Sequence, residues 1–152
     1  MLQLSYEKIF SHFLSKIEDY TIPKMTDDEF KEWCLDYLHG VVGDIRFRQA
    51  FATFRAEDNS ETVYFTFDYS YDDYSDEAYT LELIAQGMTV RWMESEVKSH
   101  PQMKLMIGTD KEKKLVDHNT VNQELYERER VNFHKMIRDR DYLLNSYISA
   151  YL

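Results

Sequence analysis

The chain has 152 residues, of which 43% are hydrophobic, and it carries a formal net charge of -10 from 28 acids and 18 bases. That length and apolar content are enough for one domain with its own core, whereas the excess of acids argues against a protein that wraps DNA by neutralising phosphates. Only four Gly and two Pro interrupt the chain, which favours long helices over a sheet with many tight turns. We therefore expect a mainly α fold in a single domain, residues 1–152.

The cysteine content and the lengths of the apolar runs indicate the cellular compartment of the protein. Cys34 is the single cysteine, which excludes an internal disulfide and fits a reducing compartment, and a small buried hydrophobe is the expected role. No apolar run is long enough to cross a membrane, and the opening MLQLSYEKIF lacks the basic and apolar blocks of a signal peptide. The sequence therefore predicts a cytosolic protein, unless an assembly carries it out.

Two amphipathic helices are predicted in the first third of the chain. Residues 5–20 place apolar side chains on one face and charged ones on the other, and Pro23 separates them from the next segment. Thr26 then precedes three acids, with an acid at the third helical position, which is an amino-terminal helix signature. The second helix should continue to Gly43 or a little beyond and pack on the first.

From residue 47 to residue 74 the periodicity changes to the alternation of a strand. A lone hairpin would have its first arm near RFRQAFATFR, its turn at residues 57–60 and its second arm at residues 62–69. An exposed acidic loop should then lead into the next helix, with these carboxylates: Asp68, Asp72, Asp73 and Asp76. The loop fails the pattern of a calcium loop, because Asp73 replaces the glycine at the sixth position and Tyr79 replaces the glutamate at the twelfth. A solvated loop is the expectation, and a weak divalent site is the alternative.

Residues 75–100 should form the central helix of the fold. Ser75 is the expected N-cap, with Asp76 and Glu77 at the positive end of the helix dipole. Apolar residues cover nearly the whole circumference of this segment, which is typical of a buried helix. Gly87 interrupts the helix at a cost of about 1 kcal/mol relative to alanine, which is tolerable where another backbone packs closely.

The last helix is predicted over residues 120–152, with Asn119 as its cap. Before it, Pro101 and Gly108 bound a short apolar piece, and the basic run at residues 111–114 reads as a solvated loop. The first half of the helix is charged on most sides, and the second half has an apolar stripe. A helix of this length has more surface than one small core can cover, so part of it should contact another subunit.

No arrangement of residues in the sequence predicts a reaction. The five histidines are scattered, without the three- or four-residue spacing that would put two imidazoles on one metal. Phosphate-binding glycine loops, nucleophile elbows and dinucleotide fingerprints are absent from the sequence. The tyrosines between residues 64 and 79 alternate with acids rather than bases, which is the opposite of a platform for single-stranded nucleic acid. We therefore expect no catalytic activity, no organic cofactor and no tightly bound metal.

The order of the segments resembles the head-to-tail connector proteins, also called adaptor or neck proteins, of tailed bacteriophages. The resemblance spans YEKIFSHFLSKIEDY, DDEFKEWCLDYLHGVVGDIRF, DEAYTLELIAQGMTVRWMESEV, MIGTDKEKKLVDHN and the closing YLLNSYISAYL. The helical and strand periodicities taken together predict a bundle of about four helices with a long carboxy-terminal helix and at most one short β-hairpin. The resemblance implies a structural virion protein that forms a ring, commonly dodecameric, below the portal and continues the DNA channel toward the tail.

The resemblance also implies partners and a location. The portal protein, the next neck or tail-completion protein and further copies of the chain would be bound, and DNA would pass through the channel without specific binding. The protein would reside in the virion neck, after assembly in the host cytoplasm, and would contact no membrane. The resemblance assigns no role to the acidic segment around residues 68–74, and its charge alone makes these acids candidates for facing the channel or a neighbouring subunit: Asp68, Asp72, Asp73 and Asp76.

The end of the chain carries large apolar residues at helical spacing: Tyr147, Ile148, Tyr151 and Leu152. We expect them to dock the protein on its portal or on the next subunit, because exposed aromatic side chains fit a groove in a partner. The alternative is that these last turns fold back on the first helix. A competing function is a small acidic regulatory or DNA-mimic protein that binds a basic host factor, although the long, partly apolar last helix favours a stable oligomer.

Overall fold

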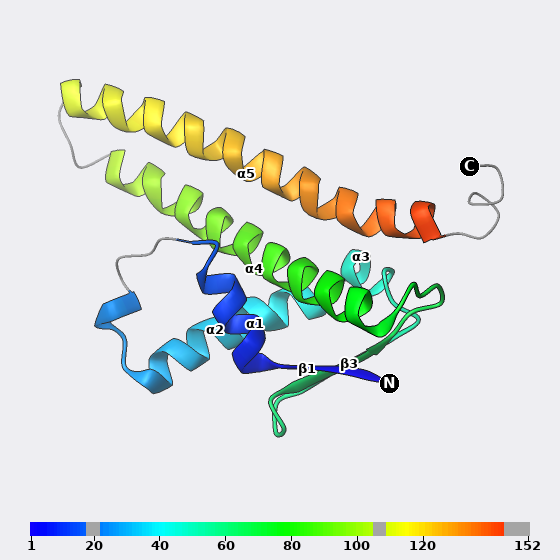
Figure 1. Cartoon of the computed structure of the whole chain (residues 1–152). Helices are drawn as coiled ribbons and strands as arrows, with labels where there is room; N and C mark the ends of the chain where they lie inside the picture. Colours follow the sequence, from blue (N-terminus) through cyan, green and yellow to red (C-terminus); the bar gives the residue numbers. More distant parts are fainter. Residues whose placement is uncertain (18–21, 105–108, 145–152) are drawn as a thin grey trace.

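Helices α1 (Tyr6–Leu14) and α2 (Asp27–Val42) of the computed structural model start where the sequence predicts (Figure 1). Thr26 caps α2 in a reciprocal box, because its hydroxyl accepts from the Glu29 backbone N–H at 3.2 Å while the Glu29 carboxylate accepts from the Thr26 N–H at 3.1 Å. The ring of Phe13 in α1 lies 5.8 Å from that of Trp33 in α2. The predicted packing of the second helix on the first is thus confirmed.

The structure describes residues 1–17, 22–104 and 109–144, and for residues 99–104, 109–122 and 141–144 it describes the backbone alone. Helix α1 ends at Leu14, before the predicted end at residue 20, and a short 3-10 helix, η1 (Ile22–Lys24), leads into α2. The C-cap of α2 is Gly43, as predicted.

A three-stranded antiparallel sheet replaces the single hairpin of the prediction. Strands β2 (Thr53–Glu57) and β3 (Thr62–Thr66) form the expected hairpin, and β1 (Leu2–Ser5) pairs with the free edge of β3, giving the order β1-β3-β2. Leu4 of β1 lies opposite Val63 of β3, and both side chains are buried. The single hairpin is therefore confirmed, but the sequence analysis missed the third strand, because this four-residue strand is stabilised by a partner about sixty positions away rather than by its own sequence.

The segment before β2 is helical rather than extended. Residues that we expected in the first arm of the hairpin form helix α3 (Ile45–Arg48), where the Asp44 carboxylate accepts from the Arg46 N–H at 2.9 Å. The rings of Phe47 and Phe51, 5.0 Å apart, are thereby turned into the core. This arm of the hairpin is consequently shorter than predicted.

Helix α4 (Asp73–Lys104) is the central element, as the sequence predicts. It contacts β1, α1, α2 and α5 (Thr109–Leu144), and every side chain from residue 83 to residue 90 is buried. Trp92, expected to be buried, is only partly so. The helix is longer than predicted at both ends, since it begins at Asp73 and continues through Pro101.

Gly87 lies where α2, α4 and α5 meet. A Cβ added there would lie 2.8 Å from Cγ1 of Val41 and 2.9 Å from Cε2 of Phe133. The close neighbours are therefore side chains of two other helices, rather than the packed backbone that the sequence suggested. The absence of a side chain at this position allows both helices to approach α4.

Helix α5 begins eleven residues before the predicted start, at Thr109, so Asn119 is inside it and the basic run at residues 111–114 is helical rather than a loop. It runs back along α4, and the two form a long antiparallel hairpin that extends beyond the sheet and the shorter helices (Figure 1). Phe133 and Ile137 are its buried contacts with the core. The fold is thus mostly helical with a small antiparallel sheet, and it is not a pure helical bundle.

Candidate functional site

The exposed acids of the prediction lie in one segment between β3 and α4. We call residues 68–74 the acidic tyrosine loop, and its carboxylates Asp68, Asp72 and Asp73 are exposed. Asp72 also caps α4, because its carboxylate accepts from the Ser75 N–H at 2.6 Å. Asp72 rather than Ser75 therefore occupies the capping position, three residues earlier than predicted.

Asp76 differs from the other three acids. Its carboxylate is 2% exposed and lies 2.7 Å from the guanidinium Nη2 of Arg140 in α5, while the Ser70 hydroxyl donates to its second oxygen at 2.5 Å. The expectation that Asp76 belongs to an exposed loop facing a channel is therefore wrong. Arg140 is 64 positions away in the sequence, and Ser70 lies in the irregular segment before the helix. The helical periodicity of residues 75–100 therefore gives no sign of either partner.

Arg140 joins the acidic tyrosine loop to both long helices. Its guanidinium carbon lies 3.8 Å from the ring centre of Phe67 and 4.7 Å from that of Tyr79, a cation–π arrangement on two rings. Nη2 also donates to the backbone carbonyl of Tyr69 at 2.9 Å. The loop is consequently fixed at its base, although its side chains point into solvent.

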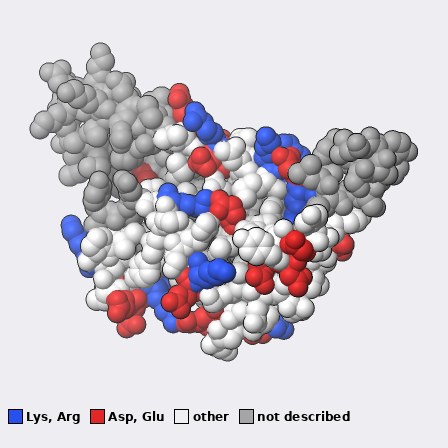
Figure 2. All heavy atoms as spheres, viewed as in Figure 1, with Lys and Arg blue, Asp and Glu red and all other residues white. Residues whose placement is uncertain are grey.

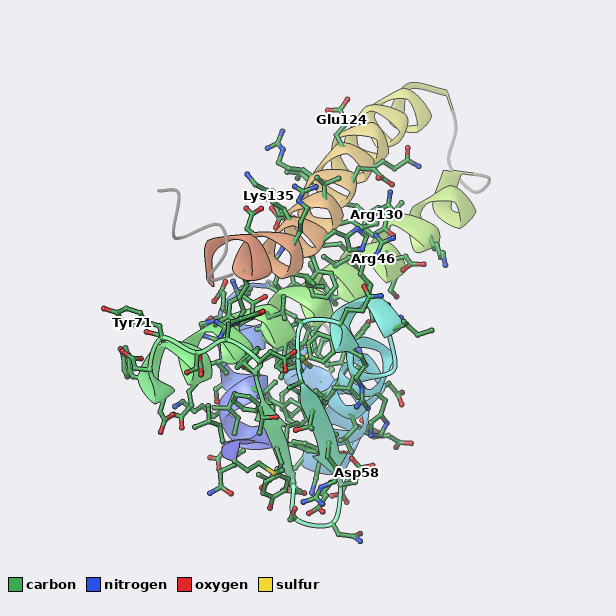
Figure 3. All side chains as sticks on the ribbon, turned by 90° about the vertical axis from the view of Figure 1, so that its right-hand side faces the viewer. Arg46, Asp58, Tyr71, Glu124, Arg130 and Lys135 are labelled. Atoms are coloured by element: carbon green, nitrogen blue, oxygen red, sulfur yellow. The ribbon has the colours of Figure 1, made fainter. Side chains whose placement is uncertain are left out.

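Three tyrosines of the loop are exposed. Tyr69 is 44% exposed, Tyr71 79% and Tyr74 83%, and Figure 3 shows Tyr71 extending away from the body of the protein. Tyrosine offers a large contact area with an apolar ring and a polar hydroxyl, and it is enriched at protein interfaces. The loop is the best candidate for a binding surface among the described residues.

The expected docking residues at the end of the chain are Tyr147, Ile148, Tyr151 and Leu152, and all four lie outside the described residues. Helix α5 is described up to Leu144. Its last described turns adjoin the acidic tyrosine loop through Arg140, so the two predicted interaction segments are attached at the same end of α5 (Figure 1).

Sequence reasoning missed a cluster that joins α1, α2 and the hairpin turn. The Tyr6 hydroxyl donates to Asp58 Oδ1 at 2.7 Å, and Nε2 of His39 lies 3.0 Å from both oxygens of the same carboxylate. Hydrogen bonds from Tyr6 and His39 lower the pKa of Asp58, whereas burial and the Asp58 contact raise the pKa of Tyr6, which keeps its proton. The cluster therefore holds the turn in place, and it presents no activated nucleophile.

A second such cluster joins α1 to α4. Glu82 Oε2 lies 2.5 Å from Nε2 of His12, and its other oxygen accepts from the ammonium group of Lys16. Burial raises the pKa of Glu82, but the hydrogen bonds from Lys16 and His12 outweigh it and leave the pKa below its usual value. The group is an ion-pair network at the edge of the core.

The surface hollows of the described residues are shallow and lack a convergent set of reactive groups. One, of about 300 Å³, lies between α1 and α2, and Tyr6, Phe10, Leu14 and Phe30 line its apolar part. Within the described ranges, no three His, Cys, Asp or Glu side chains are arranged to hold a metal ion. Across the same part of the chain, no helix combines the length and apolar character of a membrane span.

Comparisons with protein-family models, curated proteins and solved structures find no match to this chain. Functional conclusions therefore depend on the residues and their arrangement.

Proposed function

We propose that the chain is a structural protein of the tailed-bacteriophage neck, which forms a ring below the portal, joins head to tail and continues the DNA channel. The observation that carries the proposal is the acidic tyrosine loop, where Tyr71 and Tyr74 are exposed on a segment fixed by the buried pair of Asp76 and Arg140. Exposed aromatic rings on a fixed base match the aromatic side chains that dominate protein interfaces. The proposal therefore assigns the chain to assembly rather than to catalysis.

The hairpin of α4 and α5 adds support. Helix α5 covers α4 with Phe133 and Ile137, whereas Leu125 and Val131 on its other sides are 37% and 57% exposed. A long helix that is bound on one side and open on the other can contact a neighbouring subunit, and such contacts between unlike surfaces form a ring when the rotation between subunits closes.

The net charge of -10 fits a protein beside a DNA passage. The exposed carboxylates Asp68, Asp72 and Asp73 would repel phosphates, so DNA would pass this surface without adhering to it. In this role the loop faces either the channel or the next subunit, as the sequence analysis expects for these three acids.

The alternative, an acidic regulator or DNA mimic that binds a basic host factor, has less support. A mimic needs rows of free carboxylates, yet many acids of this chain are neutralised within it, as in the pairs Glu61 with Lys31, Glu94 with Lys98, Glu127 with Arg130 and Asp76 with Arg140. The exposed tyrosines, moreover, have no counterpart in a row of phosphates. A neck protein accounts for both features.

The direct test mixes the purified chain with portal rings assembled from the portal protein of the same genome, followed by co-sedimentation and electron microscopy. We expect a ring of density on one face of the portal, with substantially weaker binding for the double variant Tyr71→Ser/Tyr74→Ser. Ile45→Ser is the matched control, because Ile45 is equally exposed at 77% but lies on α3. A folded wild-type chain that leaves the portal bare, or that binds a basic factor and is displaced by duplex DNA, contradicts the proposal.

A further inference from the structure

The outer face of α5 carries a basic stripe, which we define as Arg128, Val131, Lys135 and Arg138. Their spacing of three, four and three residues places them on one line along the helix, and all four are exposed. The buried residues Phe133 and Ile137 lie about half a turn of helix away from this line. The basic stripe therefore faces away from α4.

The charges of the basic stripe are not satisfied within the described residues. Arg128 and Lys135 form no ion pair there, and Arg138 has only the carboxylate of its neighbour Asp139, at 3.8 Å. Arg130, on the flank of the stripe, is by contrast paired with Glu127 at 2.9 Å. Among the described residues, the stripe thus has two cations without an ion pair and one with a long contact to its neighbour, although the chain has a net charge of -10.

The acidic tyrosine loop has complementary chemistry. It presents three exposed carboxylates and three exposed rings, whereas the basic stripe presents three cations and one apolar side chain. Figure 2 shows Lys and Arg interspersed with Asp and Glu along the upper part of the molecule, over α5, and Asp and Glu gathered on the right-hand part below it. Opposite charges that face each other across an interface increase the association rate and determine the register of binding.

One copy cannot satisfy both surfaces by itself. Arg140 faces the loop and donates to the Tyr69 carbonyl, and Arg138, two residues earlier, is on the opposite side of the helix. Figure 3 likewise shows Tyr71 and Lys135 on separate parts of the surface. A bound stripe therefore needs a loop from another molecule.

We infer that the acidic tyrosine loop of one copy docks on the basic stripe of the next copy. The contact joins unlike surfaces, so it propagates from copy to copy and produces a ring or an open chain rather than a two-fold dimer. This inference deepens the proposed function and rests on it, because it names the contact between neighbouring subunits of the ring.

Sedimentation velocity of the free protein over a range of concentrations tests the contact. We expect the wild type to self-associate in a salt-sensitive manner. Two double variants should each raise the dissociation constant roughly tenfold or more. One changes the stripe, Arg128→Glu/Lys135→Glu, and the other changes the loop, Asp68→Lys/Tyr71→Ser. Lys8→Glu/Lys24→Glu is the matched control for the stripe variant, since it changes the net charge equally at two exposed lysines on other elements, and it should associate like the wild type.

Mixing the two defective variants sharpens the test. Each retains one intact surface, so a mixture of the two should associate, although neither variant associates alone. A wild type that stays monomeric at every concentration, or a stripe variant that associates like the wild type, overturns the inference. Circular dichroism of each variant confirms that its fold is intact.

Cysteine cross-linking locates the contact. A mixture of Tyr71→Cys and Val131→Cys chains should oxidise to a disulfide-linked dimer much faster than a mixture of Tyr71→Cys and Ile45→Cys, although Ile45, at 77%, is more exposed than Val131, at 57%. The native Cys34 does not interfere, because it is buried and its pKa is raised to about 12. Equal cross-linking rates in the two mixtures contradict the inference.

The outcomes separate the inference from the proposed function. If the stripe and loop variants lose self-association while the wild type binds no portal ring, the inference stands and the neck function fails. If the wild type binds portal rings and the stripe variant still forms a complete ring there, the neck function stands and the inference fails. Binding of the wild-type stripe to nucleic acid or to an unrelated acidic protein, in place of a second copy, also overturns the inference.

Discussion

The guanidinium Nη2 of Arg140 lies 2.7 Å from the carboxylate Oδ1 of Asp76, although 64 positions separate the two residues. The side chain of Arg140 is 9% exposed and that of Asp76 is 3% exposed, so the ion pair is almost completely shielded from solvent. The contact joins the first turns of α4 to the last described turns of α5, and Arg140 also holds the Tyr69 carbonyl. The position of the acidic tyrosine loop therefore depends on this pair.

The first prediction concerns the Asp76–Arg140 pair. Asp76→Ala should lower the free energy of unfolding by about 3 to 5 kcal/mol, because it leaves a buried guanidinium without its counter-charge. Adding Arg140→Met should recover part of that loss, since no unpaired charge then remains. Urea denaturation of the two variants and the wild type measures both values. An Asp76→Ala protein as stable as the wild type would show that the pair is not buried in solution.

The second prediction compares two helical glycines. Gly87→Ala should destabilise the protein by about 1 to 3 kcal/mol despite its better helix propensity, because the new methyl group would contact Val41 and Phe133 at less than van der Waals distance. Gly40→Ala is the matched control. Its methyl group would meet the side chain of Arg91 at 2.8 Å, and the flexible arginine can move aside. In thermal melts, Gly40→Ala should have a higher melting temperature than Gly87→Ala. The reverse order would contradict the close packing around Gly87.

The third prediction concerns acid stability. The pKa of Glu82 is below its usual value of 4.5 in the folded protein, because Lys16 and His12 donate to the ionised carboxylate and outweigh the effect of burial. The unfolded chain therefore binds this proton more readily. The stability from Glu82 is complete above about pH 4.5 and is lost as the pH falls through the lowered folded-state pKa.

Glu82→Gln measures that contribution. It should destabilise the protein by less than about 1 kcal/mol at neutral pH, because the carboxylate is 41% exposed and water screens the pair. The difference between variant and wild type in urea melts should shrink as the solution is acidified below pH 4.5. A difference that stays constant throughout the acid range would show that ionisation of Glu82 is not the cause.

The fourth prediction concerns the end of the chain. Deletion of residues 146–152 removes Tyr147, Ile148, Tyr151 and Leu152, and we expect a folded protein that no longer docks on portal rings. Circular dichroism and portal co-sedimentation are the two measurements. If the shortened chain unfolds, these residues belong to the core, and if portal binding is unchanged, they do not form the docking contact.

Local signals in the sequence were sufficient for much of the fold. The start of α2 at Thr26 follows from a cap and an acid three residues later, and the central place of α4 follows from apolar residues around its whole circumference. The hairpin turn after Glu57 was also predicted, because strand alternation is interrupted there by polar residues. Each signal is read within a few positions of the element it describes, so one sequence is enough to find it.

The tertiary structure alone decided the features that join distant segments. Residues 2–5 form strand β1 because they pair with the edge of β3. Asp76 is buried because Arg140, in α5, forms an ion pair with its carboxylate. Helix α4 continues through Pro101, and α5 begins well before Asn119, where local breakers and caps indicated boundaries. Short-range propensities are worth at most a few kcal/mol, so packing between elements can override them, and the partners that decide the outcome lie too far away in the sequence to be identified from its periodicity.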